Sequence, residues 1–138
     1  MAISFNFIET KDILTQKRKI KSWIKEVVEQ KGMKVGDISY IFCLDDYLLE
    51  INKTYLKHNY YTDIISFDYS HKDIAAGDLY ISIDRVRDNA KEFGSTFELE
   101  LYRVMIHGVL HLLGLKDKTP NQAKQMRKAE QECLKTMI

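Results

Sequence analysis

Apolar and polar side chains alternate along residues 3–8, and this period of two predicts a β-strand. Three further strands are predicted over residues 37–44, 64–69 and 79–83, and Gly77-Asp78 is expected to open the last of them. Between these segments the pattern changes to a helical one. Residues 15–31 should form a helix with one apolar face, which carries Ile20, Trp23, Ile24, Val27 and Val28.

Four more helices are indicated by their boundary residues. Asp45 is expected to cap a helix over residues 46–57, and a third helix follows the fourth strand and stops at Gly94. Ser95 and Glu98 form a capping-box pattern that predicts a helix from there to about Leu113, ended by Gly114. The last helix should begin at Thr119-Pro120.

Strands and helices are thus interleaved, with no repeat and no linker. We expect one α+β domain over residues 1–138, with a mixed four-stranded sheet and about five helices. The 45% hydrophobic and 30% charged residues are typical of a folded protein with its own core. Trp23 and Cys43 are expected in that core, and Cys43 and Cys133, which form no Cys-x-x-Cys pair, are expected to be free thiols.

Charge and targeting signals restrict the function classes only weakly. A net charge of +1 lacks the strong basic excess common in nucleic-acid binders, although a local patch is enough to bind phosphates. Lys17, Lys21 and Lys25 share a helix face that is expected to be solvated, with an RNA-facing stripe as the alternative. We see no secretory signal and no apolar run of roughly 20 residues, so we expect a cytoplasmic protein without membrane contact.

The candidate chemistry lies in the segment from His107 to Asp117. His107 and His111 are four residues apart on a predicted helix, so their imidazoles share one face and could bind one metal ion. The same face continues back to Arg103 and Glu100, which makes it a polar seam. Gly114 allows the chain to reverse and could bring Asp117 to the same point. Three protein ligands with a fourth position open is the arrangement of catalytic zinc sites.

The spacing alone is also compatible with a site that binds no metal, because paired histidines are often surface or capping residues. The segment His107-Gly-Val-Leu-His111-Leu-Leu-Gly114-Leu-Lys-Asp117, however, resembles the signature of the YbeY endoribonuclease family, His-Gly-x-Leu-His-Leu-x-Gly-x-Asp-His. Further family-like stretches occur in the expected order, so the resemblance spans nearly the whole chain. They are Asn52-Lys-Thr-Tyr55, Thr62-Asp-Ile-Ile-Ser-Phe67, Gly77-Asp-Leu-Tyr-Ile-Ser82, Asn89-Ala90 and Glu100.

The resemblance implies a metal-dependent, single-strand-specific endoribonuclease that acts in 16S rRNA 3′-end maturation and ribosome quality control. It further implies a metal-binding helix like that of zinc proteases, one zinc ion per chain, and RNA and the ribosome as partners. The nucleophile would be activated by the metal, and no general base is assigned. Lys57, Thr62, Asp63 and Ser66 are candidate substrate contacts, each with a bland alternative as a solvated, turn or strand residue.

Two positions depart from the family pattern. Asp117 stands where the signature has a third histidine; it can still bind zinc, but it lowers the site's positive charge and makes other divalent metals more tolerable. Leu56 stands where family members usually have arginine, so a bidentate phosphate clamp is lost there. Nearby basic residues could steer RNA, or be ordinary surface charge: Lys116, Lys118, Lys124 and Arg127.

Two other functions remain open. Loss of the arginine at position 56 favours a ribosome-assembly or RNA-binding factor in which the metal is mainly structural. The histidine pair is also compatible with a metal-dependent peptidase. Common zinc proteases carry their glutamate base directly after the first histidine, and this chain has Gly108 there, which argues against that function.

Overall fold

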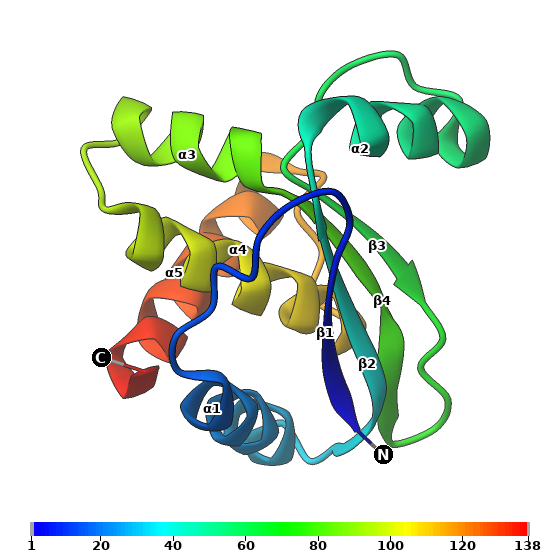
Figure 1. The fold of residues 1–138 in the computed structure, drawn as a ribbon. Helices are drawn as coiled ribbons and strands as arrows, with labels where there is room; N and C mark the ends of the chain where they lie inside the picture. The colour runs from blue at the N-terminus through cyan, green and yellow to red at the C-terminus, as the bar shows by residue number, and fades with distance from the viewer. Residues whose placement is uncertain (1, 138) are drawn as a thin grey trace.

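The computed structural model describes residues 2–137 as a four-stranded sheet with helices on both faces (Figure 1). The strands are β1 (Ile3–Phe7), β2 (Lys34–Cys43), β3 (Ile64–Asp68) and β4 (Ile74–Ser82). The helices are α1 (Lys17–Gln30), α2 (Asp45–Ile51), α3 (Ile83–Glu92), α4 (Phe97–Leu112) and α5 (Pro120–Met137), and a π-helical segment, η1 (Asn52–Leu56), extends α2. The predicted α+β architecture with a mixed sheet is therefore confirmed.

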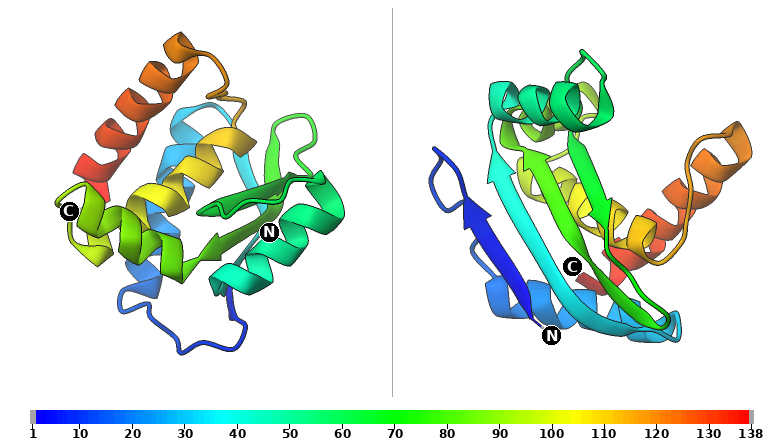
Figure 2. Two further views of the ribbon diagram at one scale, coloured as in Figure 1. Left: turned by 90° about the horizontal axis from the view of Figure 1, so that it is seen from above. Right: turned by 90° about the vertical axis from the view of Figure 1, so that its right-hand side faces the viewer.

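The sheet has the order β1-β2-β4-β3. β1, β2 and β4 run parallel, and β3 is antiparallel to β4 and forms one edge. Helices α1, α4 and α5 gather on one side of the sheet, whereas α2 lies on the other (Figures 1 and 2). The edge position of β3 matters for function, because one side of this strand faces the carboxyl-terminal half of α4.

The main core lies between the sheet and the helices α1, α4 and α5. Trp23 is 3% exposed there, as predicted, and its indole N–H donates to the Cys133 carbonyl at 2.8 Å. A smaller core joins α2 to the opposite face of the sheet and contains Cys43. Burial raises the pKa of the Cys43 thiol to about 12. Cys43 and Cys133 are both free, as expected. Lys17, Lys21 and Lys25 are exposed, in agreement with the prediction of a solvated face.

Several predicted helix boundaries were wrong. Asp45 is not a cap: α2 begins at Asp45 itself, and its carboxylate instead accepts hydrogen bonds from Ser82 Oγ (2.7 Å) and Arg85 Nε (3.1 Å). The expected 46–57 helix is split, because the chain widens into η1 after Ile51. The cap of α4 is Thr96 and not Ser95, since Thr96 Oγ1 accepts the Leu99 N–H at 3.1 Å.

Two strands begin earlier than predicted. β2 starts at Lys34, with an irregularity in its register between Val35 and Ile38. β4 starts at Ile74, so Gly77 lies inside the strand and does not open it. The interior glycine is required by close packing, because a Cβ atom there would lie 2.5 Å from the Phe67 carbonyl oxygen of β3. It would also lie 2.8 Å from Leu112 on α4, next to the second histidine.

Candidate metal centre and cleft

His107, His111 and Asp117 converge on one point, as the sequence predicted. The two histidines lie one turn apart on α4, with their Nε2 atoms 3.0 Å from each other. Gly114 adopts φ +100° and reverses the chain, which brings Asp117 Oδ2 to 3.3 Å from His107 Nε2 and 3.4 Å from His111 Nε2. Among the described residues, this is the group of histidine, cysteine and acidic side chains whose ligand atoms are placed to hold a metal ion.

The Nδ1 atoms of the two histidines form hydrogen bonds that orient the rings. His111 Nδ1 lies 2.9 Å from the Leu115 carbonyl oxygen, and His107 Nδ1 lies 2.5 Å from a Glu130 carboxylate oxygen. Both partners accept hydrogen bonds, so each Nδ1 is the donor and each ring directs its Nε2 atom to the shared point. Two Nε2 atoms and a carboxylate oxygen face one another there, and such a set can bind a metal cation.

The spacing of these atoms fits zinc. Ligands bound tetrahedrally at about 2.0–2.1 Å lie roughly 3.3 Å from each other, and the three observed separations are 3.0, 3.3 and 3.4 Å. The histidine side chains are 16% and 28% exposed and Asp117 is 38% exposed, so the point is reached from solvent. The residues therefore fit a metal ion with an open position for a further ligand.

Behind His107 lies a buried charged network that the sequence indicated only in part. Glu100 and Arg103, placed on the polar seam by the helical pattern, are joined by two hydrogen bonds of 2.9 and 2.6 Å. Arg103 also donates to Glu130 at 3.1 Å. Burial alone would raise the pKa of Glu130, but the hydrogen bond with His107 and the charge of Arg103 lower that pKa below its ordinary value. Glu130 is therefore a charged acceptor for the His107 ring.

Sequence reasoning missed Glu130, although a signal was present. The buried side of α5 repeats at helical spacing through Met126 and Met137, which are 2% and 1% exposed. Glu130 falls on that same side and is 2% exposed. A glutamate at a core position is rarely left unpaired, so its place in this stripe could have indicated a buried partner.

The metal centre lies in an open cleft of about 680 Å³. Thr62, Asp63 and Ser66, which are three of the four candidate substrate contacts, line this cleft. Lys57 does not belong to the lining; it ends η1 in the left-handed conformation, at φ 57°. Lys116 and Lys118 line the cleft beside Asp117, whereas Lys124 and Arg127 do not.

Asp63 is a half-buried carboxylate of the cleft, with its side chain 27% exposed. Its Oδ2 accepts a hydrogen bond from Asn89 at 3.3 Å and lies 3.7 Å from Arg103. Burial raises the pKa of Asp63 above its ordinary value, although the charges of Arg103 and His107 oppose this effect. Raised carboxylate pKa values are common among groups that transfer protons in clefts. Asn89, noted earlier as part of a family-like stretch, thus holds a cleft residue in place.

Gly108 explains why a glutamate base is absent beside His107. A Cβ atom at this position would lie 2.8 Å from Ile64 Cδ1 and 3.1 Å from Leu79. The position therefore faces the sheet and has no room for a long acidic side chain. The base of the common zinc proteases has no counterpart here.

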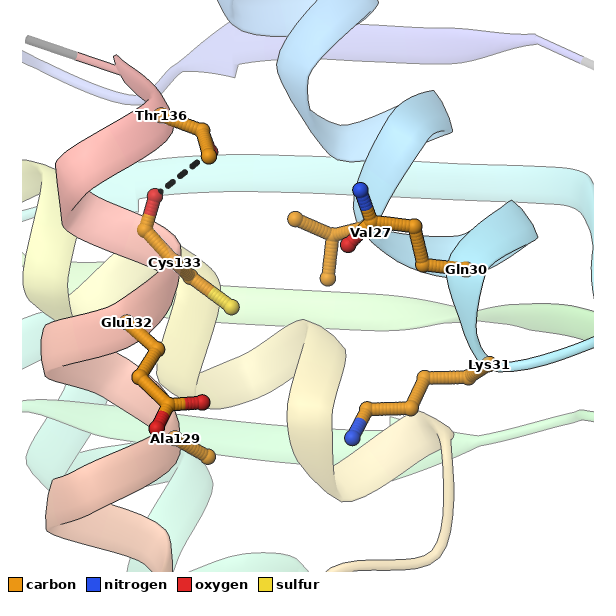
Figure 3. A pocket seen from close by; sticks show the side chains of 7 residues that line it. All are labelled: Val27, Gln30, Lys31, Ala129, Glu132, Cys133 and Thr136. Atoms are coloured by element: carbon orange, nitrogen blue, oxygen red, sulfur yellow. Dashed lines mark hydrogen bonds between the residues drawn. The ribbon is translucent and has the colours of Figure 1, made fainter.

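A second, smaller hollow of about 100 Å³ lies between α1 and α5, away from the histidines (Figure 3). Cys133 directs its sulfur atom into this gap, and Glu132 and Lys31 also line it (Figure 3). Burial raises the pKa of Cys133, so its thiol stays neutral. This hollow gathers no set of reactive groups comparable to that of the cleft.

The fold and the cleft together define the class: an α+β domain whose central helix presents a three-ligand, hydrolase-like metal centre. Comparison with known proteins then gives the family. The model of the family described as Endoribonuclease YbeY matches residues 5–138, and the chain belongs to that family.

Its relatives are similar over almost their whole length. Endoribonuclease YbeY of Bacteroides thetaiotaomicron is 46% identical over 134 residues, which cover 97% of this chain and 98% of that protein. The corresponding protein of Phocaeicola vulgatus is 51% identical over 119 residues, 86% of each chain. The solution structure of TM1509 from Thermotoga maritima has a TM-score of 0.72 at 27% identity and covers 99% of this chain and 89% of its own. The described residues include no helix that is long and apolar enough to cross a bilayer.

Proposed function

We propose that this chain is a zinc-dependent endoribonuclease that cuts single-stranded RNA, acting in 16S rRNA 3′-end maturation and ribosome quality control. The observation that carries the proposal is the convergence of His107 Nε2, His111 Nε2 and Asp117 Oδ2 in an open cleft. Membership of a family whose members are named endoribonucleases supports RNA as the substrate. The ribosome is the partner that this substrate implies, and the work would be done in the cytoplasm.

The residues of the cleft have separable roles in this proposal. His107, His111 and Asp117 would hold the metal, which when bound polarises a phosphoryl oxygen and acidifies water. Lys116 and Lys118 line the cleft next to Asp117 and would attract the phosphate backbone. Thr62 and Ser66 offer hydroxyl groups to the same cleft, and Asp63, with its raised pKa, is the first carboxylate to test for proton transfer.

Two alternative functions, a peptidase and a ribosome-assembly factor, predict different properties of the site. A peptidase would need a base that Gly108 does not supply, and a peptide-library digest that yields chelator-sensitive cleavage would favour it. A ribosome-assembly factor with a mainly structural metal would bind RNA without cutting it. The side chains of the metal centre remain partly exposed, which favours a catalytic over a closed structural site.

The test has two parts. Elemental analysis should find close to one zinc per chain in the purified wild type and much less in His107→Ala and Asp117→Ala. Cleavage of a single-stranded RNA by the wild type should then be lost in His111→Ala and Asp117→Ala and after chelation. Equal cleavage by all three proteins would rule out catalysis at this centre, and a folded wild type that binds no metal on reconstitution would rule out the metal.

A further inference from the structure

Two aromatic rings line the cleft that holds the metal centre. His58 and Tyr60 stack with their ring centroids 5.1 Å apart and their planes 19° from parallel. The Tyr60 hydroxyl lies 2.9 Å from His58 Nδ1, so the two rings are also joined by a hydrogen bond. Both residues line the cleft together with His107, His111 and Asp117, and Tyr60 remains 55% exposed.

A buried asparagine holds this ring pair in position. Asn52 is 1% exposed, and its side-chain amide donates to the Tyr60 carbonyl oxygen at 2.9 Å. The Asn52 carbonyl oxygen accepts the His58 N–H at 3.2 Å. Lys57, directly before His58, adopts a left-handed backbone conformation that turns the chain at the end of η1. The rings are therefore presented by a fixed turn at the end of η1 and need little ordering when a ligand arrives.

The surroundings of the pair favour a flat, unpaired ligand. Leu56 lines the same cleft as the two rings, so the lining includes an apolar side chain as well as the aromatic ones. Every nucleobase has a π-face that stacks on such rings, but in a duplex these faces are already covered by neighbouring base pairs. The exposed rings therefore offer a surface suited to an unpaired base.

We propose that the His58–Tyr60 pair is a stacking site for an unpaired base of the RNA strand that occupies the metal-centre cleft. This inference rests on the proposed function, because it takes RNA as the ligand. Other exposed tyrosines lack this placement. Tyr61 is 51% exposed but bonds to Asp46 and lies under Arg85, and Tyr55 packs edge-on against Phe67; neither lines the cleft.

The test measures binding of a fluorescent eight-nucleotide oligoadenylate, made with 2′-O-methyl phosphorothioate linkages that resist cleavage, to the zinc-loaded protein by anisotropy, with a gel to show that the strand stays intact. Tyr60→Leu removes the ring but keeps apolar bulk, and we expect it to weaken binding about tenfold. Tyr60→Phe keeps the ring and should bind within about twofold of wild type. Tyr61→Leu is the matched control and should bind as wild type does. An abasic strand of equal length should not distinguish Tyr60→Leu from wild type.

The outcomes separate the two proposals. Wild-type affinity in Tyr60→Leu, or an equal loss on the abasic strand, would overturn base stacking and leave the endoribonuclease function intact. Failure of the wild type to bind any single-stranded RNA would overturn both. If Tyr60→Leu does not fold, the wild type alone decides: it must bind oligoadenylate more tightly than the abasic strand, and equal affinities would refute the stacking site.

Discussion

At the scale of single residues, the hydrogen bonds of two histidine rings orient the centre. His107 and His111 each give their Nδ1 proton to an oxygen acceptor, so both Nε2 atoms are free to bind a metal. The two acceptors differ: a backbone carbonyl cannot be removed by substitution, whereas Glu130 can. Glu130 is therefore the residue through which the orientation of His107 can be tested apart from the ligands themselves.

We expect Glu130→Gln to weaken zinc binding by about 10- to 100-fold, because the His107 ring loses a charged acceptor that orients it. Competition with a chromophoric chelator measures the affinity directly and does not depend on RNA cleavage. Glu132→Gln is the matched control, since it makes the same change two residues along α5 on an exposed side chain. Equal zinc affinities in the two variants, both with wild-type thermal unfolding, would show that Glu130 has no such role.

At the scale of elements, two glycines let α4 approach the edge of the sheet. Gly77 of β4 lies under Leu112, and Gly108 of α4 lies over Ile64 and Leu79. The consequences of adding a methyl group differ. At Gly77 the nearest atom is a backbone oxygen of β3, which cannot move alone, whereas at Gly108 the nearest atom is the end of a flexible isoleucine.

Gly77→Ala should therefore lower the free energy of unfolding by about 1–3 kcal/mol, as other overpacked substitutions do. Gly108→Ala should cost under about 1 kcal/mol, since alanine also favours the helix by roughly that amount relative to glycine. Urea unfolding followed by circular dichroism gives both values. A larger loss for Gly108→Ala than for Gly77→Ala would contradict this account of how the helix and the sheet approach each other.

Much of this arrangement could be predicted from local patterns. The alternation along residues 3–8 predicted the first strand, and the four-residue spacing with Gly114 predicted that His107, His111 and Asp117 could meet at one point. What could not be predicted depends on distant partners. Asp45 looked like a cap, but tertiary contacts with Ser82 and Arg85 use its carboxylate. Glu130 is 23 residues from His107 in sequence, so no local pattern could pair them.

At the scale of the whole molecule, the cleft is assembled from distant parts of the chain. One part comes from η1, β3 and the loop between them, and the other from α4 and the turn that follows it. The buried network of Glu100, Arg103 and Glu130 then ties α4 to α5. A ligand held at the centre therefore stabilises the native state as a whole, since the unfolded chain has no comparable site.

Free zinc at 100 times its dissociation constant should raise the free energy of unfolding by about 2.7 kcal/mol. Thermal melts of the metal-free protein with and without added zinc measure the effect. His107→Ala is the informative control, because it should melt at the same temperature under both conditions. A zinc-dependent rise of equal size in this variant would mean that the metal binds elsewhere.

The position of Glu130 on the last described helix also sets an order of events during synthesis. His107, His111 and Asp117 are synthesised before Glu130, so the three candidate ligands are in the growing chain before the acceptor that orients the first of them. Only when α5 has been made and has docked on α4 does His107 gain that partner. The full metal affinity of the centre would therefore be reached only after α5 has been made and has packed against α4.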